Sequence, residues 1–216
     1  ELCLGEFDDK PFIYAKYGDN PAIADHRWAS NNSVIAELGM QYDSFAELTA
    51  INGEPGYVWI DNCRAYGRFK DGADYKDIQV MGVNPCGEQT LEHAELCCLV
   101  ECFPSKHESL SDFLDTLKLA YLYSKTVTLV PTHLPETNAV MLRNRRIGCS
   151  QSGIVDGMAK HGRRTMFDWS NKGYEYIQAL DAQYSSWLCV PRSIKTTTVK
   201  PSGSISLLPG VSAGIH

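Results

Sequence analysis

Apolar residues repeat at helical spacing in the stretch that follows Ser109. Five of them fall at i, i+3, i+4, i+7 and i+11, which places them on one face of a helix: Leu110, Phe113, Leu114, Leu117 and Tyr121. Ser109 and Asp112 before this face form a capping-box pattern. The pattern predicts a long amphipathic helix that begins just after Ser109.

Three further helices are predicted. One covers Tyr42 to Ile51 and ends at Asn52-Gly53. Another runs from Pro135 to Arg145, with proline in its first turn and arginines near its end. In the last, Asn171 is the expected N-cap of a helix with one apolar face, made of Ile177, Leu180, Tyr184, Trp187 and Leu188.

Apolar and β-branched runs between these helices predict strands at 57–60, 96–103, 147–149 and 196–200, whereas residues 64–82, rich in Gly and Asp, predict a loop. Alternating strands and long helices favour an α/β fold with a largely parallel sheet. We expect one domain over residues 1–216, and we interpret both ends of the chain as cuts within a longer protein.

Composition and charge limit the classes of function that the chain can have. The 216 residues are 44% hydrophobic and 21% charged, which is typical of a globular protein with a real core. The net charge of -6 argues against direct nucleic-acid binding, although backbone N–H groups can still hold the phosphates of a nucleotide. No apolar run reaches the roughly 18 to 20 residues of a membrane span. No secretory signal opens the chain, so we expect a cytoplasmic protein.

Eight cysteines stand in this chain. Without a secretory signal they indicate reduced thiols, some of them catalytic, rather than a disulfide framework. Structural zinc is the alternative, but no Cys-x-x-Cys pair occurs and the histidines do not cluster at ligand spacing. We therefore predict no metal site.

The most informative motif is Asn84-Pro85-Cys86-Gly87-Glu88. If this segment is extended, Asn84, Cys86 and Glu88 project to the same side. A neighbouring carboxylate raises the pKa of a thiol, so the motif suits a neutral thiol or a thiyl radical with a nearby base. The other interpretation, which the pentapeptide leaves open, is a cysteine packed in a turn beside a solvated glutamate.

Several separate stretches carry a resemblance to a known family. They are His26 to Val34 (HRWASNNSV), Asn52 to Gly56 (NGEPG), Tyr66 to Arg68, the motif around Cys86, Cys97 to Pro104, Asn144 to Gly148 (NRRIG), Ser152 to Ile154, Ser193 to Lys195, and Thr197 to Gly203 (TTVKPSG). In this order they resemble class II ribonucleotide reductases, most closely the monomeric adenosylcobalamin-dependent ribonucleoside-triphosphate reductases. The resemblance spans nearly the whole chain.

This resemblance implies part of a ten-stranded α/β barrel with a central finger loop at about 82–90. Cys86 matches the cysteine whose thiyl radical removes the substrate's 3′-hydrogen. Glu88 matches the general base for the 3′-hydroxyl proton. Asn84 matches an amide that hydrogen-bonds the ribose hydroxyls.

The resemblance also assigns Cys97, eleven residues after Cys86, as one of two thiols that reduce the 2′-position. Cys98 is then a bystander, and the partner of Cys97 is expected outside this chain. The loop of Pro201, Ser202, Gly203 and Ser204, within about 200–206, matches the site of the substrate phosphates, since a Ser/Gly turn exposes N–H donors. An ordinary turn at the end of a strand is the alternative interpretation.

The implied cofactor is adenosylcobalamin, for which no segment of the chain is assigned. The implied partners are a ribonucleotide substrate, a thioredoxin-like reductant, a nucleotide effector bound outside this chain, and further barrel polypeptide, without which we expect the isolated chain to be inactive. Two alternatives remain: a ribonucleotide reductase of another radical class, against which the spacing to Cys97 argues, and a catalytically silent module for nucleotide binding or assembly.

Overall fold

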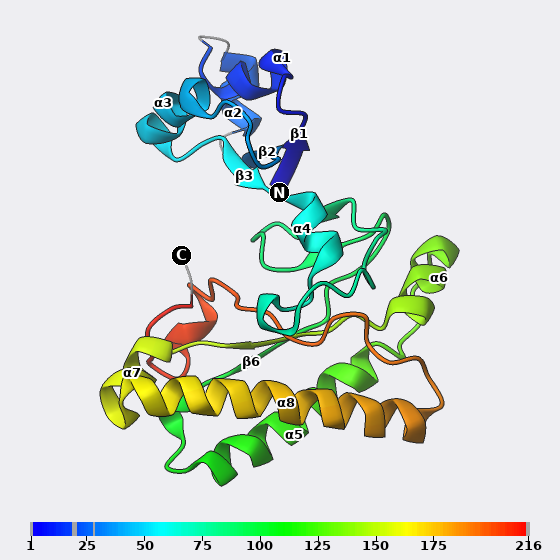
Figure 1. The fold of residues 1–216 in the computed structure, drawn as a ribbon. Helices are drawn as coiled ribbons and strands as arrows, with labels where there is room; N and C mark the ends of the chain where they lie inside the picture. The colour runs from blue at the N-terminus through cyan, green and yellow to red at the C-terminus, as the bar shows by residue number, and fades with distance from the viewer. Residues whose placement is uncertain (1, 19–20, 28, 215–216) are drawn as a thin grey trace. The chain divides into compact units, whose positions relative to one another are not determined.

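The computed structural model describes residues 2–18, 21–27 and 29–214. They fall into two compact units, Glu1–His93 and Ala94–His216, which Figure 1 shows in blue to green and in green to red. Helices and strands alternate in each unit. The mixed α/β class is thereby confirmed, while the single barrel domain stays a prediction.

The first unit is built on a parallel sheet of three strands in the order β1 (Leu2–Gly5), β2 (Asn31–Ile35) and β3 (Gly56–Val58). Parallel neighbours need a crossover connection, and helices supply it on both occasions. The elements between β1 and β2 are α1 (Lys10–Ile13), the short 3-10 helix η1 (Tyr14–Lys16) and α2 (Pro21–Arg27), and α3 (Asp43–Asn52) lies between β2 and β3. The buried residues Ile13, Val34 and Phe45 form the core of this unit.

The predicted helix at 42–51 is confirmed as α3, and Gly53 ends it with a φ of +85°. The predicted strand at 57–60 is too long, because β3 stops at Val58 and Ile60 already begins α4 (Ile60–Ala65). The loop predicted over 64–82 includes the end of α4 and the 3-10 helix η2 (Phe69–Asp71). It leads to an antiparallel pair, β4 (Gly82–Val83) and β5 (Thr90–Leu91).

The second unit contains a parallel pair, β6 (Leu99–Cys102) and β7 (Gly148–Gln151). Residues 196–200 extend alongside β7, although only Thr197 forms a bridge, to Cys149. The helical elements are η3 (Pro104–Lys106), α5 (Leu110–Val127), α6 (Pro135–Asn144), α7 (Ile154–His161), α8 (Arg163–Leu188) and η4 (Ile205–Leu207). The crossover from β6 to β7 runs through α5 and α6.

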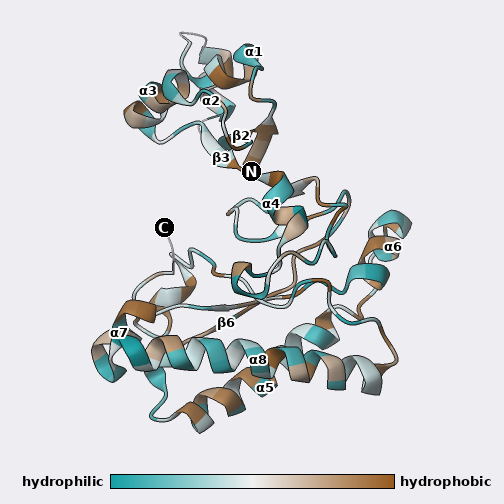
Figure 2. Ribbon diagram, in the orientation of Figure 1, coloured by the Kyte–Doolittle hydropathy of each residue, from teal (hydrophilic) through white to brown (hydrophobic). Residues whose placement is uncertain are grey.

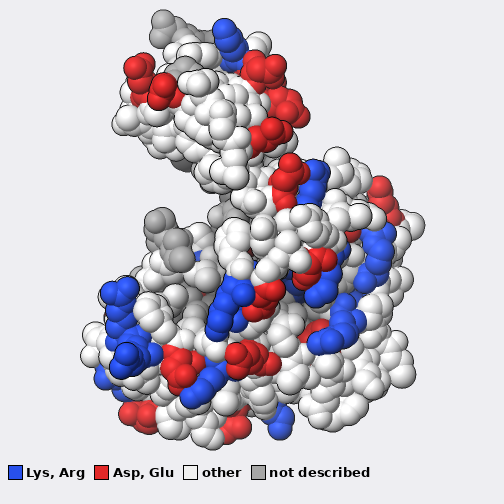
Figure 3. All heavy atoms as spheres, in the orientation of Figure 1, with Lys and Arg blue, Asp and Glu red and all other residues white. Residues whose placement is uncertain are grey.

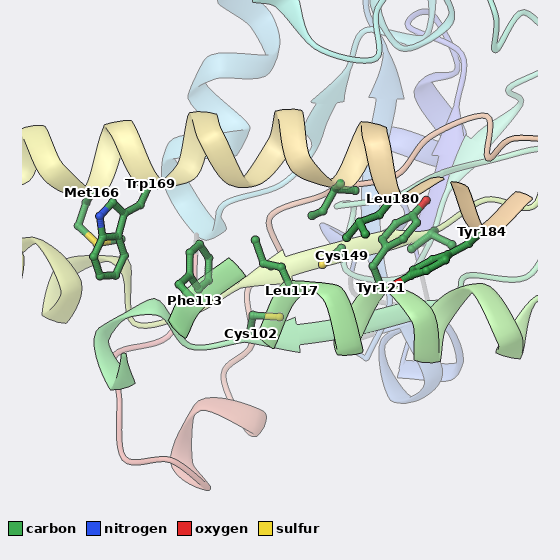
Figure 4. Packing of buried hydrophobic residues seen from close by; sticks show 11 residues of the cluster. Cys102, Phe113, Leu117, Tyr121, Cys149, Met166, Trp169, Leu180 and Tyr184 are labelled. Carbon is green, nitrogen blue, oxygen red and sulfur yellow. The ribbon is translucent and has the colours of Figure 1, made fainter. Parts of the chain in front are cut away.

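The core of the second unit lies where α5 and α8 cover β6 and β7 (Figure 4). Phe113, Leu117 and Tyr121 are buried there, as the helical spacing predicts, and the N–H of Asp112 donates to the Ser109 hydroxyl over 3.2 Å. Figure 2 shows apolar and polar residues alternating along α5 and α8, as expected of helices with one face toward a core.

The expected start of the last long helix is wrong. α8 begins at Arg163, so Asn171 lies inside it and donates from Nδ2 to Glu175 instead of capping a terminus. The face that includes Ile177, Leu180 and Tyr184 is buried as predicted. Trp187 is predicted on the same face but is 66% exposed.

Lys and Arg are interspersed with Asp and Glu on the face of the molecule that Figure 3 presents. No broad basic patch stands out on that face, in agreement with the net charge of -6. Within the described residues, no helix combines the length and the apolar character that crossing a bilayer requires.

Candidate active site

The motif around Cys86 forms the loop between β4 and β5. The N–H of Asn84 donates to the carbonyl of Gln89 over 2.9 Å, and the N–H of Gly87 donates to the carbonyl of Asn84 over 2.8 Å. The second bond closes a β-turn with Pro85 and Cys86 at its centre, where proline's fixed φ is favourable. The segment is therefore not extended, and the period-two alignment expected for Asn84, Cys86 and Glu88 does not apply.

The turn gives the three residues different environments. Asn84 is only 3% exposed, and its Oδ1 accepts from the N–H of Gln89 over 3.0 Å, so its side chain holds the loop closed. Cys86 is exposed with a free thiol, and Glu88 is half-buried. The loop thus presents the Cys86 thiol from a turn closed by hydrogen bonds.

Asp77 supports this hairpin and was missed by the sequence reasoning. It is 2% exposed, and its Oδ2 accepts from the Thr90 hydroxyl, on β5, over 3.1 Å. The two residues lie thirteen positions apart, and Asp77 belongs to the segment 64–82 that the composition indicates only as loop. No local pattern in the sequence marks such a contact.

Cys97 and Cys98 have opposite environments at the start of β6. Cys97 is exposed and Cys98 is buried. Burial, with smaller contributions from Cys97 and Glu95, raises the pKa of Cys98 to about 11. Cys98 is therefore a neutral, shielded thiol at physiological pH, and Cys97 is the accessible thiol of the two.

Glu95, two residues before Cys97, forms a buried ion pair with Arg146. The Nε of Arg146 lies 2.9 Å from one carboxylate oxygen of Glu95, and Nδ2 of Asn144 donates to the other over 3.0 Å. Both side chains of the ion pair are fully buried. The chain that enters β6 is thus fixed to the end of α6, and Arg146 has a structural role.

The loop 201–204 follows the extended segment beside β7, so it lies beyond the carboxyl end of that strand. Ligands of parallel α/β sheets bind at such ends. Gly203 and Ser204 are exposed, and among the described residues no carbonyl accepts from their N–H groups. The loop therefore presents two backbone donors and the Ser204 hydroxyl.

Ser202 differs from its neighbours in this loop. It is buried, has a φ of +55°, and donates its hydroxyl proton to Oε1 of Glu101 over 2.7 Å. The Ser152 hydroxyl donates to the same oxygen. Ser202 therefore cannot offer this proton to a phosphate in the conformation described. Glu101 was not singled out from the sequence, because it lies 101 positions from Ser202.

Hydrogen bonds connect the segment 211–214 to the loop 201–204 and to neighbouring residues. The N–H of Gly214 donates to the carbonyl of Pro201 over 2.7 Å, and the N–H of Gly153 donates to the carbonyl of Ser212 over 2.9 Å. Both the N–H and the hydroxyl of Ser212 donate to Oδ2 of Asp156 over 2.6 Å. These two bonds hold the pKa of Asp156 below its ordinary value.

The first unit also has a cavity of about 340 Å³ near the carboxyl end of β2, lined by acidic residues, by Arg64 and by apolar side chains such as Ile60 and Met81. That volume is at the small end of the range for drug-sized ligands, so it does not fit a corrin ring. Within the part of the chain that the structure describes, no three His, Cys, Asp or Glu side chains could together hold a metal ion.

The predicted site residues are thus divided between the units. Asn84, Cys86 and Glu88 share one hairpin loop of the first unit. Cys97 and the loop 201–204 belong to the second unit, where β6 links them: Cys97 precedes this strand, and Glu101 within it contacts Ser202.

No family model matches the chain. Its relatives include the adenosylcobalamin-dependent ribonucleoside-triphosphate reductase of Euglena gracilis, which is 50% identical over all of this chain and 30% of its own length. A probable enzyme of the same name from Dictyostelium discoideum is 52% identical over all of this chain and 29% of its own length. The enzyme of Lactobacillus gasseri is 37% identical over all of this chain and 33% of its own length.

Solved structures agree with these relatives. A crystal structure of a B12-dependent class II ribonucleotide reductase superposes with a TM-score of 0.92 at 35% identity, over all of this chain and 34% of that one. The α subunit of an Actinobacillus ureae class Id ribonucleotide reductase superposes with a TM-score of 0.64 at 18% identity, over 86% of this chain and 43% of that one, which shows the fold alone. The resemblance to class II ribonucleotide reductases is confirmed, and the chain spans about a third of the length of the curated relatives it matches.

Proposed function

We propose that this chain is the part of an adenosylcobalamin-dependent ribonucleoside-triphosphate reductase that carries the radical thiol, its base and one reducing thiol. The observation that carries this proposal is 50% identity along the whole chain to the Euglena gracilis reductase. The exposed Cys86 thiol on a closed turn supports it, because hydrogen abstraction needs a thiol presented in a fixed geometry. In the assembled enzyme, the hairpin at about 82–90 is the finger loop, and both units contribute strands to a ten-stranded barrel.

The proposed chemistry begins at the ribose. The Cys86 thiyl radical takes the 3′-hydrogen, which leaves a radical on C3′ and restores the thiol. Glu88 accepts the 3′-hydroxyl proton, and the 2′-hydroxyl then departs as water with a proton from one of the two reducing thiols. After C2′ is reduced, the Cys86 thiol returns a hydrogen atom to C3′, which restores the thiyl radical. Asn84 hydrogen-bonds the ribose hydroxyls in this proposal, although its Oδ1 already accepts from the N–H of Gln89.

Reduction of C2′ needs two electrons and two protons, and Cys97 supplies one of the two thiols. The second thiol comes from another part of the enzyme, and the pair ends as a disulfide that a thioredoxin-like protein reduces. The choice of Cys97 over Cys98 is supported by exposure, because Cys98 is buried with a raised pKa.

The substrate phosphates bind the loop of Pro201, Ser202, Gly203 and Ser204. The N–H groups of Gly203 and Ser204 and the Ser204 hydroxyl are suitable donors, and anions bind readily where successive N–H groups are exposed. The carbonyl of Pro201 and the hydroxyl of Ser202 are already used to hold the loop. These two residues therefore set the shape of the site.

Adenosylcobalamin, when bound, would supply the radical that activates Cys86. The cavity of about 340 Å³ in the first unit is too small for its corrin. We place cofactor binding, the second reducing thiol, the allosteric nucleotide and the site of reductant docking in the rest of a cytoplasmic catalytic polypeptide. Diphosphate substrates remain compatible with the loop.

A second candidate function is a catalytically silent module that binds nucleotides. The observation in its favour is that the second unit contains the complete 201–204 loop with its own supports, Glu101 and Gly214. Such a module would bind the phosphates of a nucleotide and form no product.

Turnover separates the two functions. The 216-residue chain and the whole polypeptide that carries it are incubated with ATP or CTP, adenosylcobalamin and dithiothreitol, and deoxynucleotide is measured by chromatography. We expect product from the whole polypeptide and none from the isolated chain. Nucleotide binding without product in both preparations would support the silent module and contradict the reductase.

A further inference from the structure

We propose that Glu101 is a positioning residue that shapes the 201–204 loop for the substrate phosphates. This inference rests on the proposed phosphate-binding function of that loop. It assigns a role to a carboxylate that the radical chemistry does not use. Glu101 lies on β6, four residues after Cys97, and thereby connects the strand of the reducing thiol to the loop.

The connection is made through a single carboxylate oxygen. Oε1 of Glu101 accepts from the Ser202 hydroxyl over 2.7 Å and from the Ser152 hydroxyl. Next to Glu101, across the strand pair, Ser150 accepts the N–H of Lys200 with its hydroxyl oxygen over 2.9 Å. The residues that flank Pro201 are thus fixed to β6 and β7 at the level of Glu101.

Ser202 needs such support because of its backbone. Its φ of +55° lies in the left-handed region, which a residue with a side chain rarely adopts. Its contacts include the bond to Glu101, a longer one of 3.4 Å from its hydroxyl to the Lys200 carbonyl, and the N–H of Ser206, which donates to the Ser202 carbonyl over 3.1 Å. The next two residues, Gly203 and Ser204, lie at the surface, and among the described residues no carbonyl accepts from their N–H groups.

The negative charge of Glu101 and its hydrogen bonds should have opposite effects on phosphate binding. A carboxylate beside a phosphate site repels the anion, so removal of its charge should by itself strengthen binding. A positioning role predicts the opposite for alanine, which abolishes the acceptor, but not for glutamine, whose carbonyl oxygen can still accept from both hydroxyls. The other oxygen, Oε2, is buried and receives no hydrogen bond from the described residues, so the carboxylate is a costly choice for stability alone.

The experiment measures the binding of inorganic tripolyphosphate to the chain by isothermal titration calorimetry. For Glu101→Ala and Ser202→Ala we expect affinity to fall about tenfold, and for Glu101→Gln we expect it to stay within about threefold or to rise. Ser124→Ala is the matched control, because the buried Ser124 hydroxyl donates within α5, to the carbonyl of Ala120. It should leave affinity unchanged.

Amide NMR adds a readout that needs no ligand. The Gly203 and Ser204 resonances should move in Glu101→Ala and remain near their wild-type positions in Glu101→Gln. Equal tripolyphosphate affinity in wild type and Glu101→Ala, or tighter binding in both Glu101 variants, would overturn the positioning role alone. Absence of binding in the wild-type chain would instead overturn the phosphate-loop proposal and the role of Glu101 with it. If Glu101→Ala does not fold, Ser202→Ala decides the question.

Discussion

The ammonium nitrogen of Lys125 lies 2.8 Å from Oδ1 of Asp181, and both side chains are buried. The pair joins α5 to α8 and extends to Ser193, whose hydroxyl accepts from Lys125 over 2.9 Å and whose N–H donates to Asp181 over 3.1 Å. Burial lowers the pKa of Lys125 even though Asp181 opposes that change. The chain from Ser193 to the 201–204 loop therefore starts from a fixed point in the core.

Breaking this pair should destabilise the second unit strongly. Lys125→Met leaves the buried Asp181 carboxylate without its closest cation, and the remaining one, Arg192, lies 3.6 Å away with its side chain 61% exposed. The expected cost is about 3–5 kcal/mol in the free energy of unfolding. Lys172→Met is the matched control, since its pair with Asp168 is half exposed and such pairs contribute about 0.3–0.5 kcal/mol. Urea unfolding followed by circular dichroism measures both. An equal decrease in the free energy of unfolding of the two variants would show that the buried pair stabilises the fold no more than the exposed pair does.

The contact between Asp156 and Ser212 should depend on pH. Because the pKa of Asp156 in the folded chain lies below its ordinary value of 3.8, the carboxylate stabilises the fold above that pH, and this contribution is lost as the pH falls through the lower folded value. The Ser212 amide resonance should therefore titrate with a midpoint below 3.8, and Asp156→Asn should abolish the titration. A midpoint at or above 3.8 would mean that the two hydrogen bonds do not form in solution.

The thiols should differ in reactivity. Cys86 and Cys97 are exposed, whereas Cys98, Cys102 and Cys149 are buried. A hydrogen bond with Cys102 and burial raise the pKa of Cys149, and both residues lie in the core in Figure 4. Iodoacetamide at a pH of about 8 should alkylate the exposed thiols first, since the thiolate is the nucleophile.

Peptide mass spectrometry assigns the alkylated positions, and urea-unfolded protein, in which all eight cysteines should react, is the control. Alkylation of Cys98 as fast as Cys97 would contradict the assignment of Cys98 as the shielded bystander.

Gly153 should tolerate no side chain. Its φ is +71°, and a Cβ there would lie 2.9 Å from the Cβ of Val211. We expect Gly153→Ala to cost about 2–4 kcal/mol, from backbone strain of about 1 kcal/mol and overpacking of about 1–3 kcal/mol. Gly210→Ala, at a φ of +63° with open space around the added Cβ, should show the strain alone. Urea unfolding compares the two, and a Gly153→Ala loss no larger than that of Gly210→Ala would contradict the tight packing of Val211.

Local features of the fold were predictable from the sequence. The start of α5 follows from Ser109, whose hydroxyl caps the helix, and the buried face of α5 follows from apolar spacing, because each depends on residues within a few turns. The start of α8 was not predictable in this way. Asn171 has the composition of a cap, but the core contacts of Trp169 and Met166 before it extend the helix back to Arg163.

In the candidate site, too, some features were predictable from the sequence and others were not. Cys86, Glu88 and Cys97 were singled out through motifs, and the exposure of Cys97 against the burial of Cys98 agrees with that choice. The segment around Pro85 is a turn rather than the extended segment considered from the sequence, because the bond from the Gly87 N–H to the Asn84 carbonyl closes it. Contacts between distant residues, such as Glu101 with Ser202, depend on the tertiary fold and have no local signal.

The role of Cys86 is tested most directly by deoxynucleotide formation in the whole polypeptide that carries this chain, with adenosylcobalamin and dithiothreitol. Cys86→Ser is compared with wild type and with Cys189→Ser, which changes an exposed thiol at the end of α8. We predict that Cys86→Ser forms no deoxynucleotide while Cys189→Ser keeps wild-type activity. Deoxynucleotide formation by Cys86→Ser at the wild-type rate would contradict the radical role of Cys86 and the finger-loop assignment.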